Sequence, residues 1–109
     1  MRKHLLPCAL CLALCACGGF VKPEPGSENL VRMESEPAGC RLLYKIDSET
    51  SAYDPEDAER FLRNRINNQT NPGNAYWIIS RRTRPIEGAI FGPSQSFALT
   101  ANVYDCPDL

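Results

Sequence analysis

Cysteine chemistry near the amino terminus decides how this chain is processed. Leu14-Cys15-Ala16-Cys17 follows a basic start, Arg2-Lys3-His4, and a short apolar run. A small residue directly before a cysteine at the end of such a run is typical of a bacterial lipoprotein signal, in which the cysteine thiol accepts a diacylglyceryl group. We therefore predict a signal peptide over residues 1–16 and lipidation at Cys17.

The predicted lipid places the protein on a membrane without a spanning helix. The apolar run is shorter than the roughly 20 residues that cross a bilayer, whereas several acyl chains on one cysteine make release negligible. Gly18 follows Cys17, where lipoproteins of the inner membrane often carry Asp, so we expect an outer-membrane anchor and a domain facing the periplasm. An ordinary cleaved signal peptide, or lipidation at Cys15, fits these residues less well.

Processing leaves two cysteines in the mature domain, Cys40 and Cys106. The others are cleaved off or lipidated, namely Cys8, Cys11, Cys15 and Cys17. Because an exported pair meets an oxidising compartment, we predict a disulfide between Cys40 and Cys106, with two buried free thiols as the alternative.

The composition of the mature chain excludes several classes of function. The only histidine, His4, leaves with the signal, and loss of Arg2 and Lys3 changes the formal charge from -1 to about -3. That balance does not suggest a partner such as nucleic acid or an anionic membrane. The mature chain has no phosphate loop, nucleophile elbow, Cys-x-x-Cys pair or convincing carboxylate pair. We predict no catalytic residues, no metal site, no cofactor and no enzymatic activity.

The first half of the mature chain predicts a tether, two strands and a helix. Residues 17–29 are rich in Pro, Glu and Ser and are expected to form a flexible tether, with the domain over residues 30–109. A short strand over Leu30–Met33 precedes a turn, and a second strand begins at Cys40. Asp54-Pro55 predicts a helix start. The predicted buried face of the second strand consists of Cys40, Leu42, Tyr44 and Ile46. The predicted buried face of the helix consists of Ala58, Phe61, Leu62 and Ile66.

Two further strands complete the predicted fold. Residues 75–80 are apolar and rich in β-formers, as in a strand buried on both faces, and residues 81–95 are expected to form a loop. A last strand alternates from Ser96 and ends at Cys106. This ββαββ order predicts a small two-layer α/β sandwich, with one helix on a mostly antiparallel four-stranded sheet. The cysteine pair would make the second and fourth strands antiparallel neighbours, with the fourth strand between the second and the third.

Several short motifs recur in an order that resembles a known family. They are Val31-Arg32, Pro37, Cys40, Leu62-Arg63-Asn64, Gly73-Asn74 and Val103-Tyr104-Asp105-Cys106-Pro107. Together they resemble the YjeI-like family of small bacterial lipoproteins, a domain of unknown function that is similar in layout to RcsF-like envelope-stress sensors. The resemblance implies a periplasmic α/β domain on a lipid anchor, with an accessory or stress-related role.

Two features could contact a partner. Arg81, Arg82 and Arg84 suit an acidic envelope protein, cell-wall carboxylates or lipid phosphates, or they form a solvated strand end that protects against aggregation. Phe91, beside Ile90 in a Gly/Pro-rich loop, is either an exposed hydrophobic contact or folded back over the sheet. The sequence thus favours a membrane-anchored binding or accessory module, and the alternative is a structural envelope component without a dedicated partner.

Overall fold

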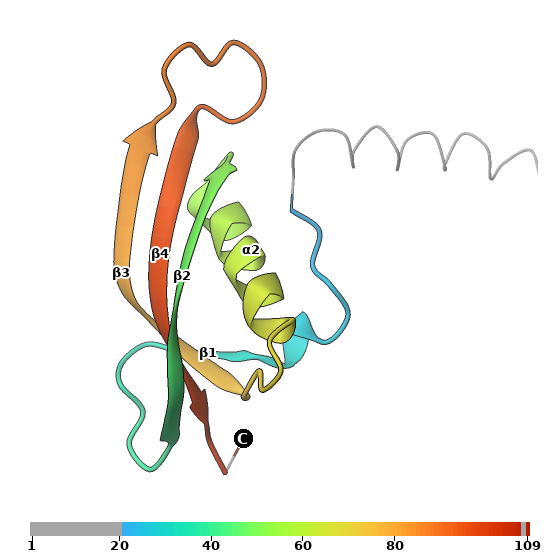
Figure 1. The fold of residues 1–109 in the computed structure, drawn as a ribbon, viewed down its shortest axis with the longest axis vertical. Coiled ribbons are helices and arrows are strands. Elements are labelled where there is room, and N and C mark those ends of the chain that lie inside the picture. The colour runs from blue at the N-terminus through green and yellow to red at the C-terminus, as the bar shows by residue number, and fades with distance from the viewer. Residues whose placement is uncertain (1–20, 108) are drawn as a thin grey trace, which may run out of the picture.

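A mixed four-stranded sheet, covered on one face by a helix, forms the domain in the computed structural model (Figure 1). The structure describes residues 21–107 and 109, so the predicted signal peptide and Cys17 lie outside the described residues. The elements in chain order are the short 3-10 helix η2 (Ser27–Asn29), β1 (Val31–Met33), β2 (Arg41–Ala52), α2 (Pro55–Asn67), β3 (Ala75–Pro85) and β4 (Gln95–Asp105).

The strand order β1-β3-β4-β2 confirms the predicted fold class. Strand β4 pairs antiparallel with both β2 and β3, so these two strands run parallel to each other on either side of it. Strand β1 adds to the outer edge of β3 as a short parallel strand. The ββαββ order therefore closes as a two-layer α/β sandwich in which β4 is paired along its whole length.

Helix α2 begins where its first residues satisfy the free backbone amides. The side chain of Asp54 accepts a hydrogen bond from the backbone N–H of Asp57 at 2.8 Å, and Pro55 occupies the first turn. Asn68 ends the helix. Of the face predicted to be buried, Ala58, Leu62 and Ile66 are buried, and Phe61 is half-buried.

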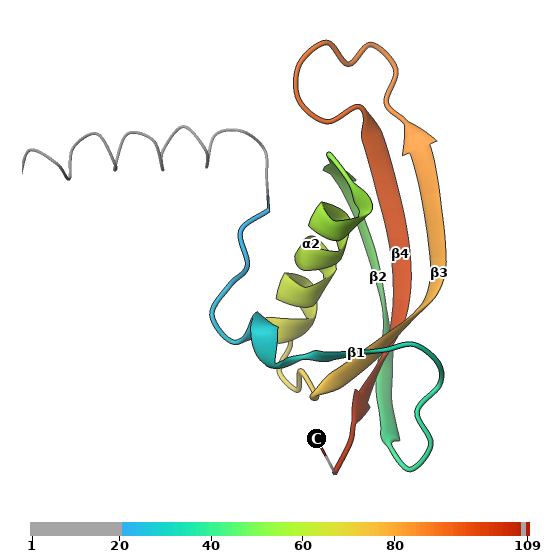
Figure 2. The same cartoon turned by 180° about the vertical axis from the view of Figure 1, so that it is seen from behind.

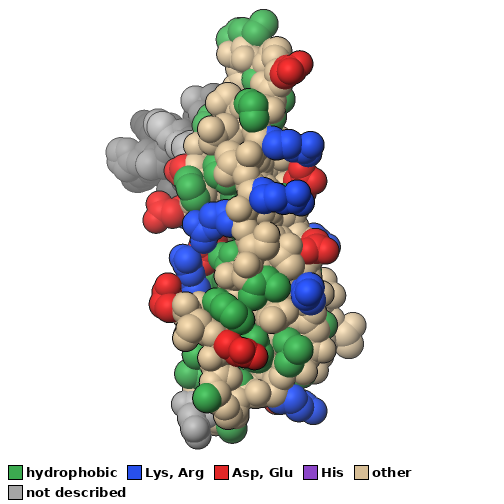
Figure 3. Space-filling model, turned by 90° about the vertical axis from the view of Figure 1, so that its left-hand side faces the viewer, with side chains coloured by type: hydrophobic (Ala, Val, Ile, Leu, Met, Phe, Trp, Pro, Cys, Tyr) green, Lys and Arg blue, Asp and Glu red, His purple; other side chains and the backbone are tan. Residues whose placement is uncertain are grey.

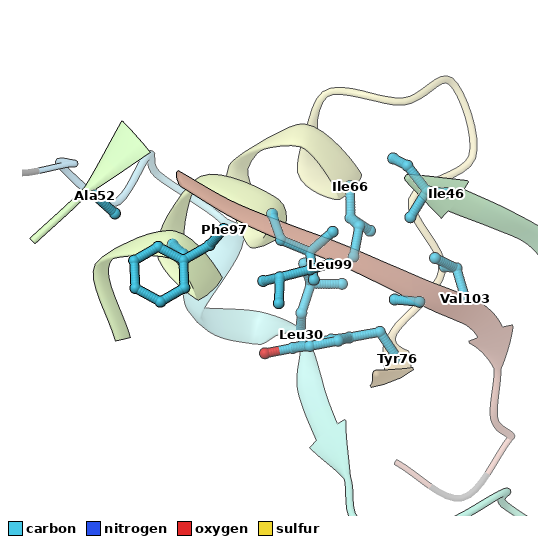
Figure 4. Close-up of a cluster of buried hydrophobic side chains, with 11 residues drawn as sticks. Leu30, Ile46, Ala52, Ile66, Tyr76, Phe97, Leu99 and Val103 are labelled. Atoms are coloured by element: carbon cyan, nitrogen blue, oxygen red, sulfur yellow. The ribbon is translucent and has the colours of Figure 1, made fainter. Parts of the chain in front are cut away.

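The main core lies between α2 and one face of the sheet (Figure 4). Strand β4 contributes every second residue to this core, as its alternation predicts, namely Phe97, Leu99, Ala101 and Val103. Leu30, Ile46, Ala52 and Tyr76 join them from other elements. The domain is therefore organised around the inner face of one central strand.

A bulge in β2 corrects the predicted buried face of that strand. The pairing with β4 shifts between Leu42 and Tyr44, so that one extra residue enters β2. Leu43 consequently packs against the core beside Tyr44, whereas Leu42, predicted to be buried, is 55% exposed. A strict period of two cannot anticipate an inserted residue, and this accounts for the wrong assignment of Leu42.

The loop predicted over residues 81–95 is also wrong over its first part. Strand β3 runs on to Pro85 and pairs with β4 from Arg81↔Leu99 to Pro85↔Gln95. Only Ala75 and Tyr76 of β3 are buried, and Ile79 is exposed, so the strand is not buried on both faces over residues 75–80 as predicted. Strand β1 covers the edge of β3 only as far as Trp77. Strand β3 is thus an inner strand at its start and an edge strand beyond it.

Residues 21–29 are docked on α2 instead of forming the flexible tether predicted for residues 17–29. The backbone N–H of Val21 donates to the buried carboxylate of Asp57 at 2.7 Å. Asn64 binds this segment twice, accepting from the N–H of Glu24 at 2.9 Å and donating to the carbonyl of Lys22 at 2.8 Å. These side chains project from one side of α2, so the segment follows the helix for most of its length (Figure 2).

The disulfide joins Cys40, just before β2, to Cys106, just after β4. Ala75 and Tyr104 are buried with Cys106 in a second apolar cluster, against which Cys40 packs. Asn74 holds the same end through its side chain, which accepts from the N–H of Cys106 at 2.8 Å and donates to the carbonyl of Cys106 at 2.7 Å. The bridge therefore closes the end of the sheet at which β2 begins and β4 stops.

We expect the paired substitution Cys40→Ser/Cys106→Ser to lower the free energy of unfolding by about 4 kcal/mol, because the loop-closure entropy removed by a bridge of this span is lost. Urea unfolding of the oxidised protein, the reduced protein and the double variant measures this. The reduced wild type should match the double variant. Two free thiols in the exported protein, found by mass spectrometry without reduction, would contradict the bridge.

Candidate partner-binding surface

The predicted arginine cluster is divided by the sheet. Arg81 pairs with the core residue Leu99 and therefore lies on the helix side, whereas Arg82 and Arg84 pair with Ala98 and Ser96 on the opposite, open face. The contiguous positive patch suggested by the sequence is thus reduced to two arginines on one face. The sequence reading missed this division because it placed these residues in a loop.

Acidic residues of β2 face these arginines across β4. Asp47 and Glu49 pair with Thr100 and Ala98 of β4, so their side chains point to the open face as well. Small β4 residues lie between the two rows, namely Ser96, Ala98 and Thr100. The open face therefore carries a trough with a basic wall on β3, an acidic wall on β2 and a floor of small side chains.

Two hollows make up the trough. One, of about 320 Å³, is lined by Glu49, Arg84 and Ser96 among others. The second, of about 380 Å³, extends it toward Asp47 and Thr100, and Arg82 lines both. Figure 3 shows Lys/Arg and Asp/Glu side chains interspersed along this side of the molecule. The surface thus offers both signs of charge within two adjoining hollows that share Glu49, Arg82 and Ala98.

Glu49 is the best-connected residue of the trough. It accepts hydrogen bonds from Arg84 at 2.8 Å and from Ser96 at 3.3 Å, and Arg82 adds a favourable electrostatic interaction. The hydrogen bonds from Arg84 and Ser96 lower the pKa of the Glu49 carboxyl. Because both partners of the Arg84–Glu49 ion pair are exposed, the pair adds little to stability and can open to a ligand.

The chemistry of the trough suits a ligand that carries both charges. Guanidinium groups bind carboxylates through paired hydrogen bonds, and the carboxylates of Asp47 and Glu49 can accept from ammonium or amide N–H groups. A peptide presents all of these groups, and the length of the trough along the strands suits an extended chain. A nucleic acid would present phosphates to the acidic wall as well as to the basic one, which disfavours it.

The tip of the β3–β4 hairpin is the second exposed feature. Ile90 is 84% exposed and Phe91 is 91% exposed, so neither folds back over the sheet. The loop from Ile86 to Ser94 is closed at its base by the backbone N–H of Ile86, which donates to the carbonyl of Ser94 at 2.8 Å. Of the two alternatives that the sequence left open for Phe91, the structure agrees with the exposed position, and contact with a partner stays a prediction.

A buried polar network, which sequence reasoning missed, ties β1 and η2 to α2. Arg63 donates to the carbonyls of Ser27 and Leu30, at 2.8 and 2.9 Å, and to the hydroxyl of Tyr76 at 3.0 Å. The Tyr76 hydroxyl donates in turn to Glu59. Burial, and then the Glu59 carboxylate, raise the pKa of the Tyr76 phenol. Glu59 and Arg63 also line a surface hollow of about 210 Å³ with Arg32, Glu56 and Arg60. Because the network satisfies the backbone carbonyls that fix β1 and η2 against α2, we assign it a structural role.

The remaining predicted positions lie away from the trough. Cys40 and Cys106 close the opposite end of the sheet from the hairpin, and Trp77 is half-buried against their cluster.

Within residues 21–107 and 109, no three His, Cys, Asp or Glu side chains come together as metal ligands. No helix in that part of the chain has the length and apolar character needed to cross a bilayer.

Searches of this chain against protein-family models, curated proteins and solved structures return no match.

We expect Arg84→Ala to raise the pKa of Glu49 toward the usual glutamate value, because the largest cause of the lowering is the hydrogen bond from Arg84. Since the folded-state pKa is lowered, the ion pair is intact above the usual value and is lost as the pH falls through the lowered one. An NMR titration of the Glu49 carboxyl carbon measures this. Arg81→Ala, on the other face, is the control, and equal midpoints in wild type and Arg84→Ala would contradict the assignment.

Proposed function

We propose that this protein is a bacterial envelope lipoprotein, anchored through Cys17 to the outer membrane, whose periplasmic domain is a binding module. Its partner is a peptide-bearing component of the envelope, either a protein segment or a cell-wall peptide, held in the trough between β2 and β3. The observation that carries the proposal is the pair of opposed charged walls, Asp47 and Glu49 against Arg82 and Arg84, over a floor of small β4 side chains.

Export is supported by one further observation. The Cys40–Cys106 bridge suits an oxidising compartment. The first described residue, Val21, is bound to α2 by Asp57, so Cys17 lies only four residues before a docked part of the domain.

The motifs that resemble YjeI-like lipoproteins agree with this proposal, and the Gly73-Asn74 motif among them has a clear role. A side chain at Gly73 would lie 2.5 Å from the carbonyl oxygen of Tyr104, and Asn74 binds Cys106.

Replacing Cys17 with Ser should abolish the incorporation of labelled fatty acid, because the acceptor thiol is lost. Metabolic labelling followed by mass spectrometry of the full chain measures this. Cys15→Ser is the matched control and should retain the label. A Cys17→Ser protein that is still acylated would show that the proposed anchor is wrong.

A photo-reactive amino acid at Ser80 should give a discrete crosslinked species in cells, because Ser80 pairs with Thr100 and so borders the trough on the open face. The same amino acid at Arg81, the next residue but on the helix side, is the matched control. We expect no corresponding species from Arg81. The absence of any species from Ser80, Asn102 and Lys45, which share the open face, would instead favour a structural envelope component.

A further inference from the structure

Among the described residues, the tip of the β3–β4 hairpin carries the two most exposed large apolar side chains. Ile90 and Phe91 are neighbours in a loop that also contains Gly88, Gly92 and Pro93. The loop extends past the end of α2, so none of the helices and strands of the described residues faces its tip in either view (Figures 1 and 2). Adjacent aliphatic and aromatic side chains exposed to this degree are candidates for contact with an apolar surface.

The hairpin lies at the same end of the molecule as the point where the predicted anchor enters. The last β2 residue, Ala52, pairs with Gln95 at the start of β4, so α2 begins directly beneath the hairpin loop. Asp57, in the first turn of α2, binds the backbone of Val21. The chain therefore reaches the domain beside the base of the hairpin, and then runs along α2 toward the opposite end (Figure 2).

The length of the connecting chain limits how far this end can lie from the lipid. From Cys17 to Val21 the chain can span at most about 14 Å, because an extended residue covers 3.3–3.6 Å. The docking of Val21, Lys22 and Glu24 by Asp57 and Asn64 removes the longer reach that a free tether through residue 29 would have. A lipid on Cys17 thus holds the hairpin end of the domain close to the bilayer.

The charges near the tip are compatible with a lipid surface. Glu87 is the one acidic residue of the loop, and Arg84 lies two residues before the loop begins. An aromatic side chain and an aliphatic neighbour favour the boundary between headgroups and acyl chains, and an arginine can bind lipid phosphates above it. The formal charge of the mature chain is negative. The apolar tip, and not the overall charge, would therefore provide the attraction of the domain to the bilayer.

We propose that Ile90 and Phe91 at the tip of the β3–β4 hairpin insert into the surface of the bilayer that holds the lipid of Cys17. This inference rests on the proposed anchor. The domain would then be fixed at two points, the lipid and the tip, with the trough on the side of the sheet and the disulfide end pointing away from the membrane. The alternative is that the tip contacts a protein partner, and the following experiment distinguishes this from insertion into the bilayer.

The test uses the full chain, lipidated in cells, purified in detergent and reconstituted into phosphatidylcholine vesicles with or without brominated acyl chains. Phe91→Trp adds a fluorophore at the tip, and Leu42→Trp adds one at the disulfide end, where Leu42 is also exposed. Trp77 is retained in both and is the only other tryptophan. We expect brominated lipid to quench Phe91→Trp several-fold more than wild type, and Leu42→Trp no more than wild type.

The outcomes distinguish failure of the membrane contact from failure of the proposed anchor. Protein that floats with the vesicles but shows equal quenching in Phe91→Trp and Leu42→Trp overturns the membrane contact, and leaves the tip for a protein partner. Protein that does not float overturns the proposed anchor and, with it, the bilayer contact. Because both substituted positions are exposed, neither tryptophan should disturb folding, and thermal unfolding of each variant checks this. The double variant Ile90→Ser/Phe91→Ser should still float, because the lipid alone retains it.

Discussion

The pairing of β4 with a strand on each side is the constraint on which both surfaces of the domain depend. Between Ser96 and Thr100 its side chains alternate between large apolar ones, Phe97 and Leu99, and small ones, such as Ser96 and Ala98. The large ones are covered by α2 and form the core, and the small ones leave room between the charged rows of β2 and β3. Since a shift of one residue would exchange the two sets, the same register that buries the core also forms the trough.

A second constraint comes from polar side chains of α2 that bind backbone groups far away in the sequence. Arg63 satisfies the carbonyls of Ser27 and Leu30, and Asn64 satisfies both an N–H and a carbonyl of residues 22–24. A buried polar group that lacks a partner is costly, so these residues specify where the amino-terminal segment lies. Composition suggests that this segment is a linker, but these contacts make it part of the domain. They also determine at which end of the domain the residues before Val21 connect to it.

The sequence predicted the elements with strong local signals. The Asp54-Pro55 helix start, the alternation of β4 and the cysteine pairing each follow from short-range chemistry or from the compartment, and together they were enough for the ββαββ sheet order. The bulge at Leu43 and the continuation of β3 through Arg81–Pro85 were not predictable, because both depend on hydrogen bonds offered by β4. The trough was missed for the same reason, since its two walls meet only through strand register. The docking of residues 21–24 on α2 was missed because it depends on partners about 36 to 42 residues away in the sequence.

The arginines of β3 are placed so that protection of an edge and the proposed recognition of a partner are compatible. Beyond Trp77, no other strand among the described residues pairs with the outer edge of β3, and such an edge invites pairing with another chain. Arg81, Arg82 and Arg84 with Pro85 make that edge charged and end it with a residue that lacks an N–H group. Only Arg82 and Arg84 also face the trough, so strand alternation gives them the second role and withholds it from Arg81. Edge protection accounts for all three arginines, and register accounts for the position of two of them on the open face, where the partner is proposed to bind.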